Sequence, residues 1–123
     1  MSTRQQLELV VDQDLGKFLA ADSELNAQVF DTDETVQSQA LECGLETVAA
    51  TVTIVTGAIT IADVAVKVTA KIKTWLARRG QESTAIISRG ETDDYALKIN
   101  RDIDPSVIEK VLHKNAFDAD ESV

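Results

Sequence analysis

Near the start of the chain Leu7, Leu9 and Val11 alternate with Glu8 and Val10, a pattern typical of a β-strand with one buried face. This pattern predicts a strand over residues 7–11, followed by a short helix that Asp12 caps. A second short strand is expected at residues 27–30, and the polar, acidic residues 31–35 are expected to form an exposed loop. The apolar face of the first helix consists of Leu15, Phe18 and Leu19.

The segment from Val36 to Arg79 has a helical period. When its residues are projected around a helix axis at steps of about 100°, the polar residues fall within an arc of about 80°. An apolar arc of about 240° remains. We predict a long apolar central helix, either continuous or broken near Gly44 or Gly57. The β-branched residues 51–56 leave a strand open as the alternative for that part. The polar arc comprises Thr53, Thr56, Thr60, Asp63, Lys67, Lys71, Thr74 and Arg78.

Beyond the central segment the period changes to that of strands. Gly80 is expected to end the central helix. Residues 85–87 and 95–99 predict a β-hairpin, since the second of these runs alternates cleanly. Asp104 followed by Pro105 marks the start of a closing helix, with a cap and a proline in the first helical position.

These elements predict an α+β fold, in which a small, mainly antiparallel sheet with a C-terminal β-hairpin packs on the long central helix and two short helices. A chain of 123 residues is long enough for one domain, which we place at residues 1–117, with an acidic flexible tail at 118–123. One small sheet and two short helices do not suffice to cover an apolar arc of about 240°, so we expect a homo-oligomer that associates through the central helix.

Charge is distributed unevenly along the chain. Residues 1–66 carry eleven acidic and two basic side chains. Residues 67–89 carry one acidic and six basic side chains, and residues 90–123 carry nine acidic and four basic ones. The net charge of −9 excludes a general nucleic-acid binder, which needs a cationic surface. The basic band at 67–89 is interpreted first as internal charge complementarity, with a docking surface for an acidic partner as the alternative.

The chain offers little catalytic chemistry. Its single cysteine, Cys43, excludes an internal disulfide, and its single histidine, His113, excludes most zinc and histidine-based sites. Cys43 is flanked by Glu42, which disfavours the thiolate, so we interpret it as a buried structural residue. We expect no enzymatic activity, no cofactor and no metal.

Two observations bear on the cellular location. The uncharged run at residues 47–62 is shorter than the roughly 20 residues that span a bilayer, and Asp63 follows it at once, so we do not expect a membrane helix. The first residues lack the apolar core of a secretion signal, and a lone thiol suits a reducing interior. We therefore expect a cytoplasmic protein.

Three local features occur together in a specific order. Residues 18–25 read FLAADSEL, and the central helix finishes with TWLARR at residues 74–79. A hairpin with a glycine-containing turn then precedes Asp104 and Pro105. In this order and spacing the chain resembles the effector-associated constant component family of bacterial conflict systems. The resemblance implies a small non-catalytic adaptor that couples sensing to effector action, and it transfers no functional residue.

We therefore expect an adaptor module that acts by protein–protein contact with an effector or a sensor, in bacterial defence or signalling. One alternative is an acidic inhibitor or immunity protein that occludes a basic partner surface, and another is a membrane-associated regulator. The expected contact surfaces are the hairpin edge and the basic end of the central helix. The interaction residues expected on that helix are Lys67, Lys71, Arg78, Asp63 and Trp75.

Overall fold

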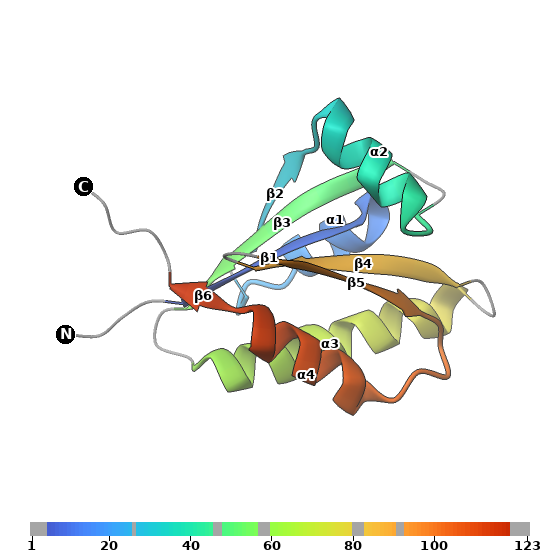
Figure 1. Cartoon of the computed structure of the whole chain (residues 1–123). Coiled ribbons are helices and arrows are strands. Elements are labelled where there is room, and N and C mark those ends of the chain that lie inside the picture. Colours follow the sequence, from blue (N-terminus) through green and yellow to red (C-terminus); the bar gives the residue numbers. More distant parts are fainter. Residues whose placement is uncertain are drawn as a thin grey trace.

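The computed structural model shows an antiparallel sheet with helices on both of its faces (Figure 1). It describes residues 5–25, 27–45, 48–56, 60–79, 83–90 and 93–118. The elements in chain order are β1 (Gln5–Asp12), α1 (Gln13–Ala20), β2 (Gln28–Asp31), α2 (Glu34–Glu42), β3 (Ala49–Val55), α3 (Ile61–Arg79), β4 (Thr84–Arg89), β5 (Asp94–Ile99), α4 (Pro105–Asn115) and β6 (Phe117–Asp118).

The strand order is β2-β3-β1-β4-β5, with the short β6 paired to the start of β1. The predicted α+β class, the hairpin of β4 and β5, and the strand at β2 are confirmed. Asp118, the first residue assigned to the tail, pairs with Gln5 in the sheet. Residues 119–123 lie outside the described part of the chain.

The sheet carries a large core on one face and a small one on the other. Helices α1, α3 and α4 cover the first face, where Leu7, Leu9 and Val52 are buried against them. Helix α2 lies on the opposite face (Figure 1), where its Ala40 packs with Val10 in the second cluster. The β1 side chains alternate between these two cores, as the pleat of a strand requires.

Aspartate side chains begin three of the helices, as N-caps do. The Oδ1 atom of Asp12 accepts from Asp14 N at 2.8 Å at the start of α1. Asp104 Oδ1 accepts from Ser106 N at 2.9 Å at the start of α4, which confirms the predicted capping there. In α2, Asp33 accepts from Val36 N at 2.8 Å. The acidic residues expected to form a loop therefore start a helix.

The predicted central helix is wrong in its middle. The segment divides into α2, β3 and α3, with a break at Gly44, whose φ of 111° places it in the left-handed region that favours glycine. The alternative prediction for residues 51–56, a strand, is the correct one: β3 covers most of them and pairs with β1 along its length. Burial alternates along β3, and its β-branched residues fit a strand hydrogen-bonded on both sides. Gly57 and Gly80 lie outside the described residues.

This division removes the reason for expecting self-association through a central helix. The apolar arc of about 240° combined positions of a strand with positions of a helix. Helix α3 by itself buries one face, which includes Val68, Ile72 and Leu76. Val66, which the helical pattern had grouped with the apolar residues, is 51% exposed.

The corrected assignment of β3 predicts that one substitution has opposite effects at two threonines. Thr53→Ala should lower the free energy of unfolding by about 0.5–1 kcal/mol, because Thr53 lies half-buried in a strand between two others. Thr74→Ala on the exposed face of α3 should raise it by about 0.5 kcal/mol, since alanine favours a helix. Urea titration followed by circular dichroism measures both. Stabilisation by Thr53→Ala would contradict the strand.

Candidate interaction surface on α1 and α3

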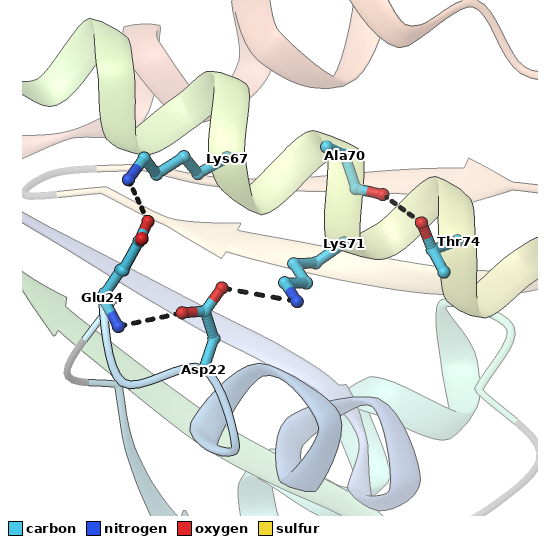
Figure 2. A network of polar contacts seen from close by, with 6 residues as sticks. All are labelled: Asp22, Glu24, Lys67, Ala70, Lys71 and Thr74. Carbon is cyan, nitrogen blue, oxygen red and sulfur yellow. Dashed lines mark hydrogen bonds and ion pairs between the residues drawn. The ribbon is translucent and has the colours of Figure 1, made fainter.

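Two lysines of α3 are paired with the loop that follows α1 (Figure 2). Lys67 Nζ donates to Glu24 Oε2, and Lys71 Nζ lies 3.4 Å from Asp22 Oδ2. Asp22 Oδ1 also accepts from the Glu24 backbone N–H at 2.8 Å, which ties the two acidic residues together. These contacts hold the loop against α3, so charge complementarity within the chain accounts for Lys67 and Lys71.

The electrostatic consequence is visible at both ends of this network. The Glu24 backbone N–H that donates to Asp22 is the main cause that lowers the pKa of this carboxyl below 3.8. Burial opposes this shift, and Lys71 adds to the lowering. The pKa of Lys67 is raised, chiefly by the hydrogen bond to Glu24. Both shifts favour the charged forms.

A depression of about 440 Å³ lies between α1 and the last turns of α3. The guanidinium carbon of Arg78 lies 5.2 Å from the centre of the Phe18 ring, and Lys71 Nζ lies 5.5 Å from it. Both distances are within the range of cation–π attraction. The depression is lined by Asp14, Lys17, Phe18, Trp75 and Arg78.

Trp75 is a buried residue in the lining of this depression. Its Nε1 donates to Asp14 Oδ2 at 3.0 Å, which connects α3 to the first turn of α1. The indole is thus fixed in orientation, as a buried tryptophan with a satisfied N–H usually is.

The structure brings some of the expected interaction residues together and separates others. Trp75 and Arg78 line the depression, and Lys71 is adjacent through Phe18. Lys67 belongs to the ion-pair network instead. Asp63 is exposed in the first turn of α3, where its backbone N–H donates to a threonine, and it does not line the depression.

Sequence reasoning missed the α1 side of this surface. Asp14, Lys17 and Phe18 share one side of α1 because they are spaced by three and four residues. Phe18 had been assigned only to the apolar face of α1, yet it remains partly exposed. The helical spacing of these three residues was the available signal, but their position opposite Arg78 depends on how α1 packs on α3.

A second depression, of about 510 Å³, lies between β2 and α2. Asp31, Asp33 and Glu34 make its lining acidic, and Val48 in the same lining is 59% exposed. Two of its lining residues are joined by a hydrogen bond, in which Gln37 Oε1 accepts from the Ala49 backbone N–H at 2.9 Å. The surface therefore combines negative charge with exposed apolar area.

Cys43 and His113 lie on opposite sides of the sheet. Cys43 ends α2 and packs against the small cluster, whereas His113 is exposed near the end of α4. Within the described residues no three His, Cys, Asp or Glu side chains are placed to hold a metal ion. Nor is any helix in that part of the chain long and apolar enough to cross a membrane. The run at 47–62, considered above for this role, instead contains β3 and the start of α3.

Comparisons with family models, with curated proteins and with solved structures returned no match. The assignment of function therefore depends on the two surfaces described above.

The ion-pair network predicts a pH-dependent stability. Because the pKa of Asp22 is lowered by folding, its carboxylate stabilises the fold above pH 3.8, and this contribution is lost as the pH falls through the folded-state pKa. Asp22→Asn retains an acceptor for the Glu24 N–H but removes the charge near Lys71. We expect the variant to be less stable than the wild type at neutral pH, and the difference to shrink below pH 3.8.

Urea titrations over a series of pH values measure this difference. Asp102→Asn is the matched control, because Asp102 is exposed and no ion pair involves it in the described part of the chain. A difference between Asp22→Asn and the wild type that is constant with pH would contradict the role assigned to the charge.

Proposed function

We propose that the protein is a non-catalytic adaptor that binds an acidic, partly apolar segment of a protein partner in the depression between α1 and α3. The observation that carries this proposal is the position of Arg78 over Phe18, with Lys17 in the same lining. Neither Lys17 nor Arg78 forms an ion pair with any residue that the structure describes. Their charges are therefore available to a partner, unlike those of Lys67 and Lys71.

Three of the lining residues supply different kinds of contact. The planar guanidinium of Arg78 suits bidentate binding of a carboxylate, and stacking on Phe18 holds it in place. Lys17 adds a second positive charge at the end of α1, and the exposed part of Phe18 offers apolar area. The ion pairs of the α1–β2 loop with α3 keep the two helices in register, so the surface is preformed.

The resemblance to the effector-associated constant component family gives this activity a context. An adaptor of that kind would act in the cytoplasm of a bacterium and would contact an effector or a sensor. In a molecule with a net charge of −9, a local cationic and aromatic surface distinguishes one acidic partner segment from the bulk of the protein. We infer that the basic band of the sequence serves both the fold and the partner, with Arg78 on the partner side.

The proposal predicts that Arg78→Glu weakens binding of an acidic peptide by at least about tenfold. The probe is a short peptide of alternating glutamate and leucine, and Trp75, the single tryptophan, reports binding by fluorescence. Because the contact is between charges, added salt should weaken it in the wild type. The same peptide with lysine in place of glutamate should not bind.

Lys110→Glu provides the matched control, because it changes the net charge equally at an exposed position on α4. If Lys110→Glu and Arg78→Glu weaken binding to the same extent, the effect comes from overall charge and the depression is not the site. Absence of any salt-sensitive binding by the wild type would also overturn the proposal.

The acidic depression favours a second candidate function, that of an inhibitor or immunity protein that covers a basic surface. Phe30 on β2, which is 51% exposed, extends the apolar area beside Asp31. In this case a lysine-leucine peptide should bind, and Asp31→Lys should weaken it by about tenfold while Asp102→Lys, with the same charge change, should not. Sensitivity at Arg78 but not at Asp31 would exclude this candidate.

A further inference from the structure

Strand β5 forms one edge of the sheet, and no described strand pairs with its outer side (Figure 1). Its residues from Asp94 to Ala96 and Lys98 are exposed. An exposed edge of this length is a ready template for pairing with another strand. We propose that two copies of the chain associate edge to edge, pairing antiparallel along β5 about a two-fold axis at Ala96.

The hydrogen-bonding pattern of the hairpin determines which backbone groups face outward. Gly90 N donates to Asp93 O at 2.9 Å, which places a hydrogen-bonded pair at the turn end of β4 and β5. Bonded and non-bonded pairs alternate along an antiparallel ladder. Tyr95 therefore bonds to β4 opposite Ser88, whereas Ala96 directs its N–H and C=O toward the free edge. The backbone N–H and C=O groups of Asp94 and Lys98, two positions on either side of Ala96, also face the free edge.

The side chains along this edge are self-complementary in a single register. With Ala96 opposite its own copy, Asp94 lies opposite Lys98 of the second copy, and the reverse pair forms by symmetry. On the other face of the sheet, Tyr95 lies opposite Leu97 of the second copy. Tyr95 is 51% exposed in the single chain, so this pairing would cover apolar surface.

Other registers are disfavoured by charge. Moving the two-fold axis by two residues, to Asp94 or to Lys98, places Asp94 opposite Asp94 or Lys98 opposite Lys98. Moving it by one residue, to Tyr95 or to Leu97, leaves Asp94 or Lys98 opposite Ala96 and forms neither ion pair. A lysine on an edge strand usually prevents pairing. Here the aspartate four residues earlier compensates for it, and only the register centred on Ala96 forms both Asp94–Lys98 pairs.

A row of alternating charge on the sheet already points toward this edge. Glu8 pairs with Arg89 across β1 and β4, and Arg89 pairs with Asp94 across β4 and β5. The Nε atom of Arg89 lies 3.6 Å from Glu8 Oε2 and 3.8 Å from Asp94 Oδ2. Lys98 of a second copy would continue this row with the opposite sign. No ion pair involves Lys98 within the described chain.

The opposite edge lacks these features. Strand β2 presents Asp31 and no cation, and it adjoins the acidic depression. Two copies joined there would bring like charges together without compensation. The β5 edge is therefore the one suited to a second copy, and this inference does not depend on the proposed binding of an acidic segment.

The test is the mass of the protein in solution by sedimentation equilibrium at low salt. An edge contact of this size is small, so we expect a dimer that dissociates in the range of about 10–100 μM and weakens with added salt. Lys98→Asp should weaken the dimer at least about tenfold, because Asp94 of each copy would then lie opposite an aspartate at position 98 of the other copy. Asp94→Lys should do the same, and the double exchange Asp94→Lys with Lys98→Asp should restore the dimer.

Two further variants separate this contact from changes in charge or folding. Lys110→Asp has the same charge change as Lys98→Asp and should leave the dimer intact. Ala96→Pro removes an N–H that faces outward in the single chain, so it should keep the circular dichroism of the fold and abolish the dimer. A wild type that is monomeric at about 100 μM, or a dimer that survives both Lys98→Asp and Ala96→Pro, would overturn the proposal.

Discussion

The double pairing of β1 is the constraint on which the rest of the structure depends. This strand is hydrogen-bonded to β3 on one side and to β4 and β6 on the other. Leu9 faces the large core and Val10 the small one, and both are fully buried. Because a central strand must be apolar on both faces, helices are needed on both sides of the sheet. The placement of α3 on one side and α2 on the other follows from this requirement.

The same constraint explains how charge is used on the surface. Once α3 buries its apolar face on the sheet, its polar side is directed toward α1 and the loop that follows α1. Acidic residues from that loop then neutralise Lys67 and Lys71, whereas Arg78 lies further along α3, over Phe18. Whether a basic side chain of α3 forms an ion pair within the fold therefore depends on its position along the helix, and not on whether it is a lysine or an arginine.

Local sequence signals predicted what depends on local physics. The caps at Asp12 and Asp104, the alternation in β1 and the hairpin are short-range features. The nature of β3 was decided by long-range pairing with β1 and β2, which a helical projection cannot contain. The helical projection was misleading because only two of the residues in its polar arc, Thr53 and Thr56, lie within residues 51–56. The other residues of the arc determined its helical period.

The candidate site divides in the same way. Arg78 and Trp75 belong to a helix whose polar and apolar faces are evident in the sequence, so they were expected. Phe18 and Lys17 became part of the site only because α1 packs beside the end of α3. Such an arrangement is a tertiary property, and the spacing within α1 indicates only that the two residues share a face.

A dimer joined at β5 would affect how the depression between α1 and α3 works. A two-fold axis perpendicular to the sheet keeps the faces of both copies on the same side, so both α3 helices would lie on one surface of a continuous sheet. Two depressions on one surface can engage two acidic segments of a single partner or of a paired partner. The second contact would then form at a high effective concentration, so two weak sites could give firm binding. Edge pairing in one register would thereby determine the spacing between the sites.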